Sequence, residues 1–241
     1  MEAETEAETV TTKTSVHLSV VIMAFNEARG LRQVTEEIHG ELTRLGRSFE
    51  ILIVDDGSSD GTGSLANELA LSYPWVRACH HEVNRGLGGV YRTGFAEARG
   101  EWLTFFPADG QFPASIIGDY VASSTDVDII LGTLPKRDGS VIARGLSMAE
   151  RLLLKTLFGR FPSFQGILMF RRELLERTPL VSQGRGWTVL MEFILRAMRA
   201  GARIKNIPIT MRPRSSGTSK VNNLRSISSN LRQILALRLR M

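Results

Sequence analysis

Two adjacent carboxylates, Asp55 and Asp56, follow a short apolar run at residues 51–54. Two negative charges after a buried strand are costly unless a cation or hydrogen-bond donors face them. The hydroxyl groups of a ribose, or the N–H groups of a nucleobase, would meet that need. Asp60 has a simpler interpretation, because it can cap the helix that we expect to begin at Thr62. That cap does not explain Asp55.

Asp109 and Gln111 offer two oxygen ligands on one predicted loop. Mg²⁺ takes few protein carboxylates and completes its shell with water and substrate phosphates. A metal site is therefore one interpretation of this pair. The other is turn chemistry, which an Asp-Gly sequence also favours.

A glycine-rich run, residues 84–89, opens a predicted helix. Glycines let the backbone approach a ligand, and the N-terminus of a helix favours phosphate. The spacing differs from the dinucleotide-binding fingerprint, and a lone Gly-x-Gly-Gly run does not by itself specify a phosphate site.

The remaining candidate residues receive structural interpretations. His39, His80 and His81 have no metal-ligand spacing, so we expect them to be solvated or to cap helices. Cys79 is the only cysteine, which excludes an intrachain disulfide, and we expect it to be a core thiol. No nucleophile motif of the Gly-x-Ser-x-Gly kind is present.

Short apolar runs alternate with helical patterns through the first half of the chain. Such alternation predicts an α/β fold with a mostly parallel sheet covered by helices. Predicted strands are residues 18–22, 51–54, 76–79, 102–106 and 129–131, followed later by 167–170 and 204–209. Sites in such sheets lie at the carboxyl ends of strands. That rule selects four polar or glycine-rich segments: residues 23–27, 55–60, 84–89 and 108–111.

The second half contains predicted helices at residues 146–158 and 187–200, then a polar loop at 212–223. Residues 1–15 have the composition of a disordered acidic tail. We therefore expect one α/β domain over residues 16–223 and a basic amphipathic helix over 224–241. The apolar stripe of that helix fits a membrane interface or packing against the domain.

Ten lysines or arginines and no acidic residue lie between Ala197 and Met241. Such a tail suits an anionic partner or a solvated surface. A nucleic-acid partner is disfavoured, because few aromatic residues accompany these charges. The sequence has no apolar stretch of membrane-spanning length and no secretory signal, so a cytoplasmic location is expected.

Four stretches that overlap the segments selected above resemble family 2 glycosyltransferases of the GT-A fold. They are residues 19–27, 53–62, 84–88 and 108–113. Residues 170–174 and 214–220 resemble the dolichol-phosphate mannose synthase branch, which includes other polyprenyl-phosphate glycosyltransferases. The resemblance extends over residues 17–235 and implies a single GT-A (Rossmann-like) domain.

The resemblance also implies roles for individual residues. The nucleotide-sugar would be held by Phe25, Glu27, Asp55, Asp56, Gly88 and Ser219. Asp109 and Gln111 would bind Mg²⁺ or Mn²⁺ on the diphosphate, and Asp109, Arg214 and Lys220 would act in catalysis. Glu192 matches a glutamate of the family and would have a supporting role.

The chain departs from the family pattern at several positions. Pro107 occupies the place of the first Asp in the Asp-x-Asp motif, and Met23 replaces a proline. Residues 162–166 replace a more polar stretch. Residues 130–137 lack the usual Gly-Ser-Arg but contain Lys136 and Arg137.

The function expected from this resemblance is inverting transfer of a hexose from GDP-mannose or a UDP-sugar to a polyprenyl phosphate. Such an acceptor is already ionised and needs no strong general base. The enzyme would be peripheral on the cytoplasmic face of a membrane, alone or with a membrane partner subunit. The alternatives are a family 2 transferase with a soluble or polysaccharide hydroxyl acceptor, and a degenerate protein that only binds nucleotide-sugars.

Overall fold

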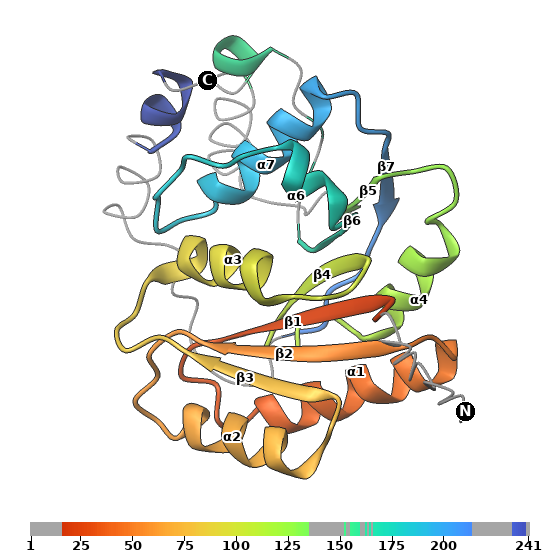
Figure 1. Ribbon diagram of the computed structural model, residues 1–241, viewed down its shortest axis with the longest axis vertical. Coiled ribbons are helices and arrows are strands. Elements are labelled where there is room, and N and C mark those ends of the chain that lie inside the picture. Colours follow the sequence, from red (N-terminus) through yellow and green to blue (C-terminus); the bar gives the residue numbers. More distant parts are fainter. Residues whose placement is uncertain are drawn as a thin grey trace, which may run out of the picture.

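In the computed structural model, the strands in the described part of the chain form one seven-stranded sheet with the order β3-β2-β1-β4-β6-β5-β7 (Figure 1). The structure describes residues 16–134, 152, 155–159, 162, 164, 166–213 and 233–239. The strands are β1 (Leu18–Ala24), β2 (Phe49–Asp55), β3 (Val76–His80), β4 (Trp102–Pro107), β5 (Ile129–Thr133), β6 (Leu168–Arg171) and β7 (Ile204–Pro208). All seven predicted strands are confirmed, each within two residues at either end.

Most neighbouring strands are parallel. β1 pairs in parallel with β2 and β4, β2 with β3, and β5 with β7. The exception is β6, which runs antiparallel to both β4 and β5. Strand direction was not visible in the sequence, because a strand buried on both faces has the same apolar run in either direction.

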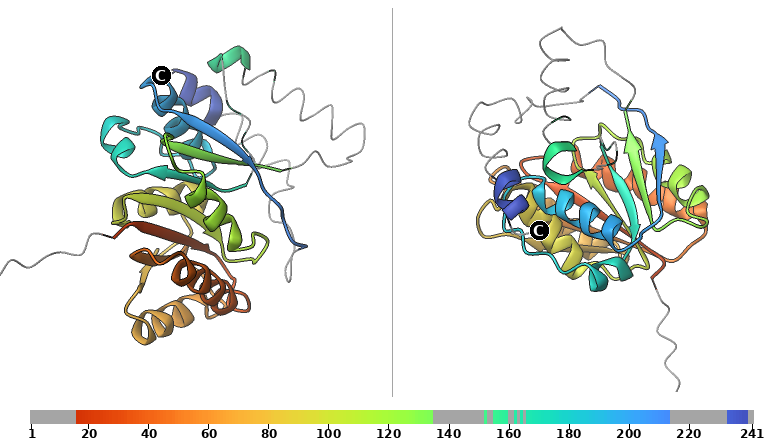
Figure 2. Two further views of the ribbon diagram at one scale, coloured as in Figure 1. Left: turned by 90° about the vertical axis from the view of Figure 1, so that its right-hand side faces the viewer. Right: turned by 90° about the horizontal axis from the view of Figure 1, so that it is seen from above.

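Helices cover both faces of the sheet, as the two views of Figure 2 show. One face packs against α1 (Leu31–Leu45), α2 (Thr62–Ser72) and α4 (Ser115–Ala122), and the other against α3 (Gly86–Glu97), α6 (Glu173–Arg177) and α7 (Thr188–Arg199). Alternate residues of β1 serve the two faces, since Val20 and Ile22 belong to the first core and Val21 to the second. The short helices α4 and α6 were not predicted.

The end of the chain returns to the domain. Residues 233–239 are helical, and Ile234 and Leu237 pack against Met191 and Leu195 of α7. The apolar stripe of the C-terminal helix was expected to meet a membrane interface or to pack against the domain. Ile234 and Leu237 pack against the domain, whereas Leu235 is exposed. None of the described helices has the length and hydrophobicity that a membrane crossing requires.

Several predictions concern residues outside the described ranges. These are the acidic tail at residues 1–15, most of the helix at 146–158, most of the loop at 212–223, and residues 224–232 of the C-terminal helix. Lys136, Arg137, Arg214, Ser219 and Lys220 also lie outside the described residues. Their predicted roles stay predictions.

Candidate active site

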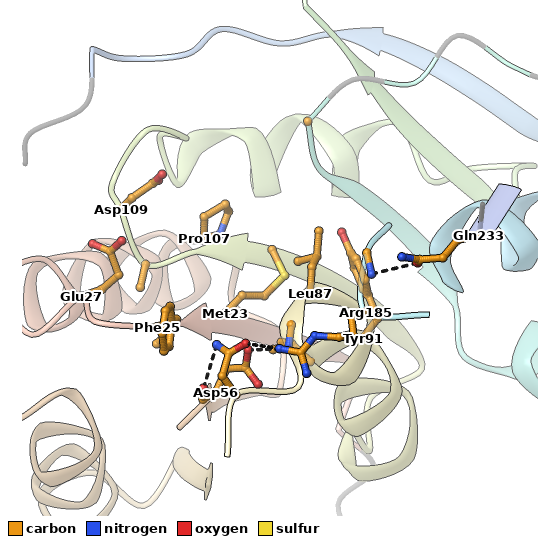
Figure 3. Close-up of a pocket in the computed structure, with 17 residues that line it drawn as sticks. Met23, Phe25, Glu27, Asp56, Leu87, Tyr91, Pro107, Asp109, Arg185 and Gln233 are labelled. Atoms are coloured by element: carbon orange, nitrogen blue, oxygen red, sulfur yellow. Dashed lines mark hydrogen bonds between the residues drawn. The ribbon is translucent and has the colours of Figure 1, made fainter. Parts of the chain in front are cut away.

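A cavity of about 770 Å³ lies at the carboxyl ends of β1, β2 and β4, beside the first turn of α3. The topology reverses here, because β2 and β3 lie on one side of β1 and β4 lies on the other. All four segments that the sequence pattern selected contribute residues to its wall (Figure 3). Further lining residues come from outside these segments: Val90, Tyr91, Pro107, Gly166, Arg185, Gly186 and Gln233.

The loop after β1 is fixed by the loop after β2. The N–H of Asn26 donates to Ser58 Oγ at 2.9 Å, and the N–H of Glu27 donates to Thr62 Oγ1 at 2.9 Å. Asn26 takes a left-handed conformation with φ of 54°, which asparagine tolerates better than most residues. This geometry makes Phe25 and Glu27 part of the cavity wall.

The Asp56 carboxylate anchors the start of α3. It is 3% exposed and accepts hydrogen bonds from the N–H groups of Arg85 and Gly86, at 2.8 and 2.9 Å. His81 Nδ1 lies 2.7 Å from the same carboxylate, and its Nε2 bonds to Thr93. Asp56 therefore lines the cavity from a position that protein donors hold in place.

Asp55 is held in a similar way by His80, whose Nδ1 lies 3.1 Å from Asp55 Oδ2. The N–H of Ser58 donates to the other carboxylate oxygen at 3.2 Å. Asp55 is not among the lining residues of the cavity. The partners that the two carboxylates require are thus present within the protein. The prediction that Asp55 contacts the nucleotide stays a prediction.

The expectation that His81 is solvated or caps a helix was wrong, since it is 6% exposed and bonded to Asp56. One signal could have revealed this pairing. β2 and β3 are parallel, and Asp55 stands opposite His80 in their register. Two carboxylates at the end of one strand therefore meet two imidazoles at the end of the next.

Asp109 lines the cavity, and its Oδ1 accepts the N–H of Gln111 at 3.1 Å. Glu27 and Pro107 flank it in the view of Figure 3. Gln111 is not a lining residue, and among the described residues no group of three or more His, Cys, Asp or Glu side chains could hold a metal ion. Oxygen donors suit Mg²⁺ or Mn²⁺. A site with one carboxylate fits a cation that brings substrate phosphates and water as its other ligands.

The chain just before residue 214 runs beside this turn. The N–H of Arg212 donates to the carbonyl oxygen of Gln111 at 2.7 Å, and its guanidinium pairs with Glu37 at 2.9 Å. Burial would raise the pKa of Glu37, but hydrogen bonds from Arg212 and the Ala114 N–H outweigh it and lower that pKa. The ion pair thus ties the end of the β7 segment to α1.

Arg185 is a cationic wall residue that the sequence did not predict. It belongs to residues 181–186, here called the 181–186 loop, which joins α6 to α7. Its Nη2 donates to Asn84 Oδ1 at 2.7 Å, and Asn84 Nδ2 donates to the backbone oxygen of Asp56 at 3.2 Å. The loop reaches the cavity only through the folding of α7 against α3, so no local pattern marks it.

Glu192 fixes the beginning of this loop. Its side chain is fully buried on α7 and accepts the N–H groups of Val181 and Ser182, with bonds of 3.1 and 2.8 Å. Arg196 Nε, one turn later, lies 2.7 Å from the same carboxylate. In these contacts Glu192 acts on the loop rather than on the cavity.

Gly88 supports close packing. Its N–H donates to the carbonyl oxygen of Arg185 at 2.9 Å, and a Cβ atom at this position would overlap the carbonyl oxygen of Gly184. Gly88 does not line the cavity, although Gly86 does. The first N–H groups of α3 therefore bind Asp56 and Arg185. The predicted contact of Gly88 with the nucleotide stays a prediction.

Comparison with known proteins gives consistent results. The family model described as glycosyl transferase family 2 matches residues 19–178. The chain is 30% identical over 236 residues to a polyprenol monophosphomannose synthase of Mycolicibacterium smegmatis, covering 90% of this chain and 83% of that protein. It is 29% identical over 230 residues to a dolichol-phosphate mannosyltransferase of Pyrococcus furiosus, covering 91% of this chain but only 63% of that protein.

Solved structures support the fold. A glucosyl-3-phosphoglycerate synthase from Mycobacterium tuberculosis, in complex with Mn²⁺, UDP-glucose and phosphoglyceric acid, has a TM-score of 0.68 at 20% identity and covers 95% of this chain and 80% of that chain. A Pyrobaculum calidifontis mannosyltransferase with GDP-mannose and Mn²⁺ has a TM-score of 0.64 at 20% identity, covering 93% of this chain and 64% of that chain. The family match, the relatives and the fold agree, and the chain belongs to glycosyl transferase family 2.

Proposed function

We propose that this protein transfers a hexose from a nucleotide-sugar to a polyprenyl phosphate with inversion at the anomeric carbon. One observation carries the proposal: the loops after β1, β2 and β4 bring Phe25, Glu27, Asp56 and Asp109 to one cavity. The names of the Mycolicibacterium and Pyrococcus relatives support the choice of acceptor.

The donor would lie across this cavity, with its nucleoside near Phe25 and Asp56 and its diphosphate near Asp109. Asp109 would hold a divalent cation together with the diphosphate, with Gln111 as a further oxygen ligand. A bound cation stabilises the negative charge that develops on a departing diphosphate. Arg214 and Lys220 are proposed to share that task, and Ser219 to contact phosphate.

An ionised phosphate acceptor needs no general base from the protein. An oxygen of the ionised polyprenyl phosphate attacks the anomeric carbon, the bond from that carbon to the diphosphate breaks, and the nucleoside diphosphate leaves with the electron pair. No proton has to be removed from the nucleophile. Catalysis then rests on positioning and charge stabilisation.

A lipid acceptor implies contact with a membrane. Leu235 and Leu239 on residues 233–239 are exposed, and Arg238 is exposed beside them. We propose that this end of the chain meets an anionic membrane surface on the cytoplasmic side, or a membrane partner subunit.

The test is a donor screen with labelled GDP-mannose and UDP-glucose, with and without polyprenyl phosphate. Label that enters the organic phase only when the lipid is present supports the proposal. A labelled aqueous product would instead indicate a hydroxyl acceptor, and nucleotide-sugar binding without turnover would indicate a binding protein.

A further inference from the structure

The 181–186 loop is enclosed between two parts of the structure. On one side it lies against the first turn of α3, where Gly86 and Gly88 leave room for its backbone. A Cβ atom on Gly86 would come within 2.6 Å of the Arg185 carbonyl oxygen. On α3, Arg92 also donates to the carbonyl oxygen of Gly184 at 3.1 Å.

Gln233 contacts the loop from the other side. Its Oε1 accepts the N–H of Gly186 at 3.3 Å (Figure 3). The same oxygen accepts the hydroxyl of Thr188 at 3.1 Å. A Cβ atom on Gly184 would overlap this same amide oxygen. The backbone of the loop thus fits between the glycines of α3 and one side chain from the end of the chain.

That side chain belongs to a docked segment. Ile234 and Leu237 are 4% and 3% exposed and form a small core with Met191 and Leu195 of α7. Leu157, Phe158 and Trp187 pack around this core. The docking brings Gln233 to the cavity wall, at a position about 45 residues beyond the loop that it contacts.

The loop also carries a positive charge to the cavity. Arg185 is bonded to Asn84, and Asn84 to the backbone oxygen of Asp56, so Asn84 joins Arg185 to the segment after β2 on the same cavity wall. A nucleoside diphosphate is an anion for which an arginine fork provides charge-assisted hydrogen bonds. The position of Arg185 depends on the loop that bears it.

We propose that Gln233 is a positioning residue: it holds the 181–186 loop so that Arg185 faces the nucleotide, and the donor site is complete only when residues 233–239 are docked on α7. The proposal rests on the proposed function in one respect, that the cavity takes a nucleoside diphosphate. Its structural half, the coupling of the C-terminal segment to the loop, does not depend on any ligand.

The structural half is tested by amide hydrogen exchange in the ligand-free protein. Gln233→Ala is expected to speed exchange of residues 182–188 by about five- to tenfold, because the hydrogen bonds from Gly186 and Thr188 to Gln233 are lost. Ala236→Gln is the control, since Ala236 is exposed on the same segment. Equal exchange in both variants would overturn the proposal, whatever the cavity binds.

The functional half is tested by calorimetric titration with UDP and GDP. Gln233→Ala should weaken binding about five- to tenfold and raise the donor KM while kcat changes little. Arg185→Ala should weaken binding similarly, and the double variant should be no weaker than Arg185→Ala. If the double variant lost affinity by the product of the two single losses, Gln233 would not act through Arg185. If Gln233→Ala lowered the Tm but left nucleotide affinity unchanged, its role would be structural only. Either result would contradict the proposal. If the unsubstituted protein binds neither nucleotide, the proposed function fails, and the exchange result still decides the coupling.

Discussion

Asp109 is the carboxylate on which the proposed metal site depends, because Pro107 takes the place of a second one. Asp109→Asn keeps the shape of the side chain and removes its charge. We expect turnover to fall by at least about tenfold, since stabilisation of transition-state charge is commonly worth several kcal/mol. The measurement is the initial rate at saturating Mg²⁺ or Mn²⁺. Asp119→Asn is the control, because Asp119 is exposed on α4. Equal rates in the two variants would remove Asp109 from the metal site.

His81 is the residue for which the structure differs most from the sequence prediction. Its side chain and that of Asp56 are each 4% exposed, so the bond between them is almost fully desolvated. His81→Ala should lower the free energy of unfolding by about 1–3 kcal/mol, because a buried carboxylate loses a donor. Urea denaturation measures this loss. His80→Ala is the matched comparison, since the side chain of His80 is 36% exposed, and it should cost clearly less. If His80→Ala lowered the free energy of unfolding more than His81→Ala, the buried pair of His81 and Asp56 would contribute little to stability.

At the scale of elements, an ion pair joins Asp128 and Arg203, the residues immediately before the parallel strands β5 and β7. Asp128 Oδ2 accepts the backbone N–H of Arg203 at 2.8 Å, and the Arg203 guanidinium lies 3.1 Å from Oδ1. The hydrogen bond from Arg203, helped by the charges of Arg203 and Arg171, lowers the pKa of Asp128 despite partial burial. The pair therefore stabilises the far edge of the sheet while Asp128 is ionised.

The sign of the pH dependence follows from that shift. A carboxyl whose pKa is lower in the folded state stabilises the fold above its unfolded pKa of about 3.9, and loses this effect as pH falls through the folded value. Asp128→Asn should lower the urea midpoint slightly at about pH 7, and the difference should shrink as pH falls below about 3.9 and vanish only below the lowered folded pKa of Asp128. Asp126→Asn, at an 89% exposed partner of the same arginine, should change little at either pH. A difference that persists in acid would exclude the ion pair as its cause.

At the scale of the whole molecule, the net charge of +5 is distributed unevenly, with the basic residues concentrated toward the C-terminus. We expect the protein to float with anionic vesicles at low salt and to be released as salt rises. Arg238→Gln should weaken this binding roughly fivefold, since one basic residue near such a surface contributes about 1 kcal/mol. Arg47→Gln changes an exposed arginine just before β2 and serves as the control. Equal binding by both variants would place the membrane contact elsewhere.

Much of the fold and part of the candidate site could be predicted from the sequence. Most of the strands were visible because a strand buried on both faces is a short continuous apolar run. The partly exposed strands β3 and β7 depart from this pattern. The segments that meet at the cavity were visible because polar and glycine-rich residues follow those runs directly. The rule selects the segments that contain Phe25, Glu27, Asp56 and Asp109, the family resemblance assigns roles to these four residues, and each of them lines the cavity.

Tertiary structure alone decided the rest. The antiparallel direction of β6 and the approach of Arg185 and Gln233 to the cavity join segments that are distant in the sequence. Local patterns record which residues are buried and which can turn the chain. They do not record which helix end or loop lies across from a strand, because that depends on how the layers of the whole domain pack together.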